Sequence, residues 1–145
     1  MDPLQNKEIN DFFADEIREI IILLKDEIRQ LFAGQLQESQ HFENFGQIVD
    51  RIYGTATTLG FQDIGEYTRL LKEICYKSAQ SDNIKGREKT AQLMIESIRL
   101  LESLAKSVHN SDEIKKIRIA LSVEKGKAQN LSRSAFFSIK KGSCD

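Results

Sequence analysis

The spacing of apolar side chains constrains this chain more than any other feature. In its first third, apolar residues recur at steps of three and four positions, which aligns them on one face of an α-helix. The members of this stripe are Phe13, Ile17, Ile20, Ile21, Leu24, Ile28 and Leu31. Gly34 follows, and glycine commonly ends a helix. No stretch alternates in the manner of a β-strand, so the sequence predicts an all-α fold.

Three further stripes predict three further helices. Gly60 ends the second, and the third begins near Gln62 with Asp63 as its cap. A polar loop at 81–86 precedes the fourth. The stripes consist of Phe45, Ile48, Val49, Ile52, Ala56 and Leu59; Ile64, Tyr67, Leu71, Ile74 and Cys75; and Ala91, Met94, Ile98, Leu101, Ala105 and Val108. Four amphipathic helices with short connections favour an antiparallel four-helix bundle, which we assign to residues 1–109.

Residues 110–145 follow as a fifth helix and a basic tail. Asn110 is the expected cap of this helix, and Ile114, Ile117 and Leu121 begin its stripe. Glu124 and Gly126 interrupt the stripe. The side chains that can resume it are Ala128, Leu131 and Ala135.

Two interpretations of the tail stay open. Phe136, Phe137 and Ile139 stand among basic residues, which are Arg133, Lys140 and Lys141. Such a mixture can dock on a partner's groove or on an anionic surface. The alternative is a final helix that packs its phenylalanine pair back on the bundle.

Composition places the chain among single-domain globular proteins. It has 145 residues, of which 40% are apolar and 30% are charged. The longest apolar run, Ile20–Leu24, is far shorter than the roughly 20 residues that a membrane span needs. Cys75 and Cys144 are too few for a disulfide framework, and Cys75 is an expected core thiol. The N-terminus lacks the pattern of a signal peptide, so we expect a cytoplasmic protein.

Charge is spread unevenly along the chain. Residues 1–50 carry 4 basic and 11 acidic side chains, whereas residues 110–145 carry 8 basic and 4 acidic ones. We interpret this as a solvated acidic helix and a basic tail, and we expect no nucleic-acid partner. No cysteine and histidine spacing fits a metal site, and no glycine-rich phosphate loop occurs. We therefore expect no cofactor.

One segment carries a resemblance to a known family. Gly54-Thr55-Ala56 and Leu59-Gly60-Phe61 stand at the spacing of the signature of histidine-containing phosphotransfer (HPt) domains, and Ile52 fills its leucine position. The chain resembles most the HPt domain at the N-terminus of chemotaxis histidine kinases, over roughly residues 10–108. The resemblance implies a four-helix bundle, often with a fifth helix, in bacterial two-component signalling.

The departures from this family affect its chemistry. Asp50 stands where the family has its phosphorylated histidine, Tyr53 where it has a lysine, and Lys72 where the chemotaxis variety has a glutamate. A carboxylate lacks the ring nitrogen that accepts a phosphoryl group. An aspartyl phosphate would need a cation site, and no carboxylate cluster surrounds Asp50 in the sequence. We therefore expect a protein that is not an enzyme.

The second helix presents these positions away from its core stripe. At about 100° per residue, Asp50 and Gly54 lie about 140° and 180° from Phe45. Glycine inside a helix costs about 1 kcal/mol relative to alanine, so Gly54 indicates close approach of either a partner's backbone or a neighbouring helix. If the second and third helices are antiparallel neighbours, as the resemblance implies, Lys72 or Arg69 can reach Asp50. The candidate partner-binding residues are Asp50, Tyr53, Gly54, Thr57, Arg69 and Lys72.

Two functions fit these patterns. The first is a phosphorylation-incompetent HPt-like module that binds a receiver domain of a response regulator or a histidine kinase. The alternative is a structural bundle that forms homodimers through Ile22, Leu23 and the Phe136–Phe137 pair; Ile22 and Leu23 can instead contact a neighbouring helix. Two histidines, His41 and His109, fall outside the family's site, and we expect them at the surface or at helix caps.

Overall fold

The computed structural model describes residues 6–136 as five helices joined by short connections. The helices are α1 (Lys7–Ala33), α2 (Ser39–Leu59), α3 (Gln62–Gln80), α4 (Ile84–Ser107) and α5 (Ser111–Ala135). No strand occurs in residues 6–136, and the all-α prediction is confirmed. None of the described helices is both long enough and apolar enough to cross a membrane.

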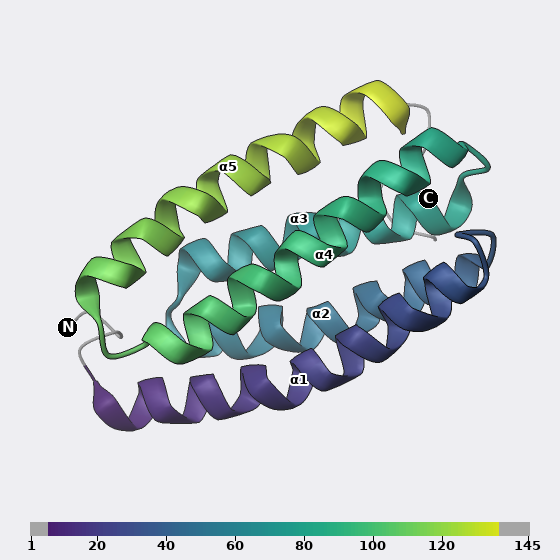
Figure 1. The fold of residues 1–145 in the computed structure, drawn as a ribbon. Helices are drawn as coiled ribbons and strands as arrows, with labels where there is room; N and C mark the ends of the chain where they lie inside the picture. The colour runs from purple at the N-terminus through teal and green to yellow at the C-terminus, as the bar shows by residue number, and fades with distance from the viewer. Residues whose placement is uncertain (1–5, 137–145) are drawn as a thin grey trace.

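Consecutive helices run in opposite directions along one common axis (Figure 1). Helix α1 packs against α2 and α4, and α2 packs most extensively against α3. Helix α5 lies over α3 and α4, on the side away from α1 (Figure 1). Helix α5 therefore does not cover the outer surface that α2 and α3 form together.

The core consists largely of the predicted stripes, of which Ile28, Ile48 and Leu59 are only partly buried. The interior side chains of α1 through α4 are buried almost completely, and they form one continuous cluster with those of α5. The ring of Phe61, between α2 and α3, stacks on Phe13 of α1 with 4.4 Å between the ring centroids. Cys75 is fully buried, as expected for a core thiol.

Most predicted helix ends are confirmed, and two are wrong. Gly60 ends α2 with φ 88°, a conformation that glycine adopts without strain. Asn110 caps α5 by accepting a hydrogen bond from the Glu113 N–H. Asp63 is not the cap of α3, because Phe61 takes that position and Asp63 lies in the first turn. The loop predicted at 81–86 covers only 81–83, because Asn83 accepts from the Gly86 N–H and starts α4 there.

Two glycines set the close approach of α2 and α3. A Cβ at Gly46 would come within 2.7 Å of the Tyr76 ring and 3.3 Å of the Cys75 Cβ. A Cβ at Gly65 would stand 3.3 Å from Thr57 Oγ1. The absence of side chains at these two positions lets α3 lie directly against α2.

Helix α5 continues through the interruption that the sequence indicated. Glu124 is buried with the apolar stripe, and the helix ends only at Ala135. Phe136 is fully buried, and its ring occupies the space that a side chain at Gly86 would need. This residue therefore packs on the start of α4. The other tail residues named above, Phe137, Ile139, Lys140, Lys141 and Cys144, lie outside the described residues.

The buried Arg87 of α4 joins three parts of the chain at one end of the molecule. Its Nη1 donates to the carbonyls of Leu36 and Gln37, and its Nη2 donates to Ser39 Oγ. Its Nε donates to the carbonyl of Ser78. Burial lowers the pKa of this guanidinium. All five N–H groups are used, counting a longer bond from Nη2 to the carbonyl of Ala79 at 3.5 Å.

Candidate functional site

Asp50 and Lys72 form an ion pair across α2 and α3. Lys72 Nζ donates to Asp50 Oδ1 at 3.0 Å. The Asp50 side chain is 46% exposed and that of Lys72 is 26% exposed. Of the two cations that the sequence offered to Asp50, the structure places Lys72 beside it. Arg69 instead donates to Glu73 at 2.8 Å, one turn along α3.

Two tyrosines flank this ion pair. Lys72 Nζ lies 5.8 Å from the centroid of the half-buried Tyr53 ring, within range of a cation–π contact. Tyr76 lies near the same charges. Partial burial, followed by Asp50 among the nearby charges, raises the pKa of the Tyr76 phenol, while Lys72 opposes this rise. Sequence reasoning missed Tyr76, although it follows Lys72 by one helical turn on the same face.

Gly54 lies one turn after Asp50 on the same exposed side of α2. A Cβ built there would meet no described atom within 4 Å. Contact with a neighbouring helix, one of two explanations for this glycine, is therefore wrong within the described residues. The next turn of α2 carries Thr57, whose exposed side chain lies over Gly65 of α3.

We name the partly exposed strip formed by Asp50, Tyr53, Gly54, Thr57 and Lys72 the Asp50 face. Lys72 Nζ links the ion pair and the tyrosine, at 3.0 Å from Asp50 Oδ1 and 5.8 Å from the centroid of the Tyr53 ring. Arg69 is the one candidate whose described ion pair faces elsewhere, toward Glu73. The Asp50 face thus offers a compensated charge pair, an aromatic ring and an open glycine, which together suit binding of another protein.

Both histidines lie away from the Asp50 face. His109, at the end of α4, is half-exposed, and its Nε2 lies 2.7 Å from Asp11 Oδ1. His41 lies in the first turn of α2 and is partly buried, with its side chain 13% exposed. Its Nδ1 lies 2.8 Å from Glu27 Oε2 and its Nε2 lies 3.1 Å from Glu38 Oε2. The hydrogen bond with Glu27 raises the pKa of His41.

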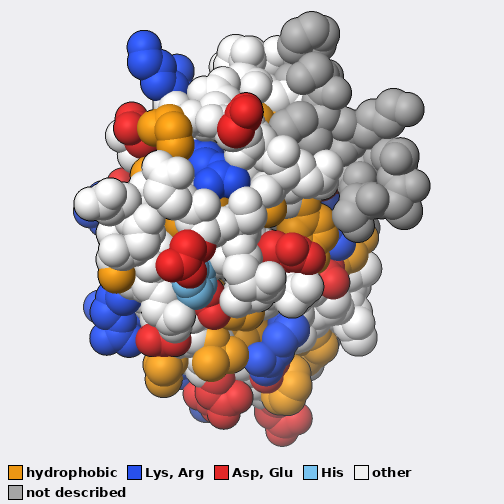
Figure 2. All heavy atoms as spheres, turned by 90° about the vertical axis from the view of Figure 1, so that its right-hand side faces the viewer, with side chains coloured by type: hydrophobic (Ala, Val, Ile, Leu, Met, Phe, Trp, Pro, Cys, Tyr) orange, Lys and Arg blue, Asp and Glu red, His pale blue; other side chains and the backbone are white. Residues whose placement is uncertain are grey.

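The end of the molecule that carries the α1–α2 connection shows the surroundings of this imidazole. Figure 2 views that end and shows acidic side chains gathered around a histidine. The sequence did not indicate this arrangement, since Glu27 and His41 come from different helices and stand 14 positions apart. Glu27 also accepts from Asn44 Nδ2, at 3.4 Å.

Other reactive groups lie in the interior or do not cluster. Burial raises the pKa of the Cys75 thiol, which keeps it in the unreactive protonated form. Within residues 6–136, no group of three or more metal-ligating side chains is placed to hold a metal ion.

Comparison with known proteins adds no relative. No family model matches the chain, and no curated protein or solved structure matches it either. The resemblance to HPt domains stays a prediction from the residues that carry it. The functional conclusion below depends on that resemblance and on the geometry of the Asp50 face.

Proposed function

We propose that this protein is a phosphorylation-incompetent HPt-like interaction module of a bacterial signalling pathway. In this proposal α1 to α4 act as an HPt-like four-helix bundle, and α5 is an additional helix. The partner is a receiver domain of a response regulator or a histidine kinase, and it contacts the Asp50 face. This proposal combines the resemblance of residues 52–61 with the surface of α2 and α3.

The open side of Gly54 is the observation that carries the proposal. A glycine inside a helix costs about 1 kcal/mol relative to alanine. Gly46 and Gly65 offset this cost by letting α3 approach, whereas no described atom lies close enough to Gly54 to explain its missing side chain. Gly126 of α5 is open in the same way, so it is the open side of Gly54 together with the HPt-like residues around it that supports a partner docking against the bare backbone of α2.

The chemistry of Asp50 favours recognition without transfer. Its carboxylate has no ring nitrogen to accept a phosphoryl group, and one of its oxygens is occupied by Lys72 at 3.0 Å. A phosphoryl group that approached this carboxylate would bring further negative charge, and the neighbouring Lys72 ammonium is already paired with Asp50. We therefore expect no stable phosphate on this chain after incubation with a phosphorylated receiver domain.

The electrostatics of the face refine how a receiver domain would dock. Receiver active sites are acidic, and two like charges at 4 Å repel by about 1–4 kcal/mol depending on screening. Lys72 offsets the charge of Asp50 only in part, since both side chains remain accessible to solvent. In this proposal Mg²⁺ bridges the carboxylates, or the contact is centred on Tyr53, Gly54 and Thr57.

The test is a titration of the full chain with a purified receiver domain, with and without Mg²⁺. Gly54→Gln is expected to weaken binding at least tenfold, because its side chain would fill the open space. Gly126→Gln is the matched control, since Gly126 also lies inside a helix with open space beside it, on α5. Equal affinity of the two variants, or tight metal-free binding that depends on Asp50, would contradict the proposal.

One observation supports the alternative function, a structural bundle that forms homodimers. Ile22 and Leu23 of α1 are 67% and 43% exposed, which leaves apolar surface available to a second copy. They remain candidates for a homodimer interface, whereas the buried Phe136 does not. Sedimentation of Leu23→Asp beside the exposed control Val123→Asp would separate the functions. A dimer that only Leu23→Asp disrupts would favour the oligomerising bundle.

A further inference from the structure

Two helices carry nearly all of the exposed large apolar side chains among the described residues. Seven such side chains are at least 40% exposed, and six of them belong to α1 or α5. They are Phe12, Ile22, Leu23 and Phe32 of α1, and Ile119 and Val123 of α5. Apolar side chains that gather on the exposed face of a helix commonly mark an interaction surface. Helices α1 and α5 lie on opposite sides of the molecule, and both pack against α4 (Figure 1).

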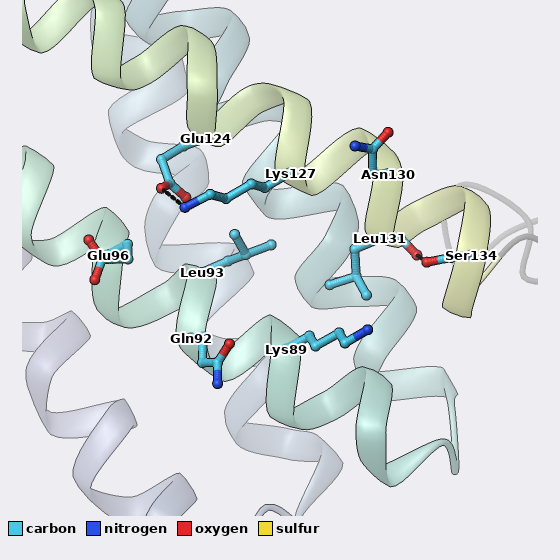
Figure 3. A pocket seen from close by; sticks show the side chains of 9 residues that line it. All are labelled: Lys89, Gln92, Leu93, Glu96, Glu124, Lys127, Asn130, Leu131 and Ser134. Carbon is cyan, nitrogen blue, oxygen red and sulfur yellow. Dashed lines mark hydrogen bonds and ion pairs between the residues drawn. The ribbon is translucent and has the colours of Figure 1, made fainter.

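The outward side of α5 combines its apolar side chains with an open glycine. At about 100° per residue, Ile119, Val123 and Gly126 lie opposite the buried stripe of this helix. Ile119 and Val123 are 68% and 54% exposed, and a Cβ at Gly126 would meet no described atom within 4 Å. One turn later the side chain of Asn130 points away from α4 (Figure 3). The bare backbone at Gly126 therefore allows another helix to approach α5 closely.

The exposed charges beside these residues are mainly positive. Lys115, Lys116 and Arg133 are exposed on the same side of α5. Lys116 pairs with Glu113 of its own helix, whereas Lys115 and Arg133 have no ion-pair partner within residues 6–136. Helix α5 as a whole carries six basic and three acidic side chains, a net charge of +3. We name the α5 outer face the surface formed by Lys115, Lys116, Ile119, Val123, Gly126, Asn130 and Arg133.

The outward side of α1 is apolar and negatively charged. Four exposed carboxylates stand among its exposed apolar side chains. Two of the carboxylates pair with arginines of the same helix, and such exposed pairs are weak. Helix α1 carries seven acidic and four basic side chains, a net charge of −3. We name the α1 outer face the surface formed by Glu8, Phe12, Asp15, Glu19, Ile22, Leu23 and Asp26.

The two outer faces are complementary but cannot meet within one molecule. Both are apolar, their charges are opposite in sign, and they point to opposite sides of the bundle (Figure 1). A second copy can bring its α1 outer face to the α5 outer face of the first. Each copy then keeps one unoccupied face, so further copies can be added at both ends.

We propose that this protein associates head to tail, with the α1 outer face of one copy packed against the α5 outer face of the next. Opposite charges orient the two copies, and Leu23 lies against the open backbone of Gly126. The contact is weak and sensitive to salt, because its charged groups are exposed. It differs from a symmetric homodimer, in which α1 would meet α1. It uses no residue of the Asp50 face and does not rest on the function proposed for that face.

The test is analytical ultracentrifugation of the full chain over a range of concentrations. We expect species larger than a dimer at high concentration, and association at least tenfold weaker in about 0.5 M salt than in about 0.05 M salt. Leu23→Asp and Ile119→Asp should each abolish self-association, because each variant keeps only one intact outer face. Ile84→Asp changes an exposed apolar side chain of α4 and is the matched control, which should associate like the unmodified chain.

A mixture of the two disabled variants gives the most specific result. Leu23→Asp keeps its α5 outer face and Ile119→Asp keeps its α1 outer face, so equal amounts should form a one-to-one dimer and nothing larger. Gly126→Gln should weaken self-association at least tenfold, because its side chain fills the open space. Circular dichroism checks that each variant is folded. If Ile119→Asp does not fold, the double variant Lys115→Glu/Lys116→Glu takes its place in the mixture.

Four outcomes would overturn the proposal. The first is a monomer at all concentrations up to about 1 mM, and the second is association that does not weaken with salt. The third is a dimer that persists in Ile119→Asp, which would indicate a symmetric α1 contact. The fourth is a mixture of the disabled variants that stays monomeric. In the sedimentation experiment described for the alternative function, head-to-tail association predicts that Val123→Asp disrupts the assembly as Leu23→Asp does.

Discussion

The α2–α3 and α4–α5 interfaces join antiparallel helices of similar length, but only the first is closed. Gly46 and Gly65 remove side chains where α2 and α3 meet, so the two backbones approach closely. Between α4 and α5 the facing positions include Glu96, Glu124 and other long polar side chains, and a cavity of about 530 Å³ remains. The size and polarity of a few facing residues decide whether a helix pair closes or leaves a cavity between the two helices.

Asp50 at the α2–α3 interface and Glu124 at the α4–α5 interface also differ in their exposure to solvent and in their hydrogen bonding. Asp50 is nearly half-exposed, and its ion pair with Lys72 contributes little to stability in water. Glu124 is buried, and one of its oxygens lacks a donor among the described residues. The exposed pair can be broken at little cost, whereas the buried carboxylate lowers the stability of the folded protein.

The largest effect is expected from filling the closed interface. Gly46→Leu places its Cβ within 2.7 Å of the Tyr76 ring, so α2 and α3 must separate. We expect the free energy of unfolding to fall by about 3 kcal/mol, measured by urea denaturation. Gly126→Leu, which meets open space on α5, should gain about 0.5 kcal/mol. Similar values for both variants would show that the α2–α3 interface is not closely packed.

The second-largest expected effect is a gain in stability at the α4–α5 interface. Glu124→Leu removes the unbonded oxygen and extends the apolar stripe of α5, so we expect thermal denaturation to show a gain of about 2 kcal/mol. Glu113→Leu, on the exposed side of the same helix, should change stability by less than about 0.5 kcal/mol. A loss of stability in Glu124→Leu would mean that the carboxylate supports the fold.

A smaller gain is expected at the Asp50 face. Gly54→Ala should stabilise the protein by about 0.5–1 kcal/mol, because alanine favours the helix and the added methyl meets open space. Gly65→Ala is the comparison, since its Cβ would press on Thr57 Oγ1 at 3.3 Å. Chemical denaturation should rank Gly54→Ala above Gly65→Ala. If Gly65→Ala proved more stable than Gly54→Ala, Gly54 would have to be in contact with a group outside the described residues.

The smallest effect concerns a partly buried carboxylate that does have partners. Glu27 raises the pKa of His41 above its ordinary value of 6.5. This stabilisation is fully present below pH 6.5 and is lost as the pH rises through the pKa of the folded protein. We expect a loss of less than about 1 kcal/mol between pH 6 and 8 in denaturation experiments. His41→Gln should not show this loss, and a stability that rises over this range would contradict the assignment.

The fold could be predicted where the signal is local and repeated. The apolar stripes specified all five helices, and the asparagine at 110 and the glycines at 34 and 60 specified their ends. The loop at 81–86 was predicted too long because the cap at Asn83 is a single residue within a polar run. The sequence did not predict the role of Arg87, because its acceptors are mostly backbone carbonyl groups of segments distant in the chain. No sequence pattern indicates such acceptors.

The candidate site could be predicted in part for a similar reason. The contact of Asp50 with Lys72 follows from two helical periodicities and an antiparallel pair, so it was available to sequence reasoning. Whether Gly54 faces a helix or open space depends on the helix packing, which the sequence left undecided. Glu124 looked like an interruption of the α5 stripe, because its burial and its orphaned oxygen are properties of the packed interior.

The guanidinium of Arg87 has a consequence for how the protein opens. It ties the α1–α2 connection, the first residue of α2 and the end of α3 to one side chain of α4. These segments cannot fray one at a time, because releasing any of them leaves the same buried cation short of acceptors. Amide hydrogens at that end should therefore exchange with solvent as one cooperative unit.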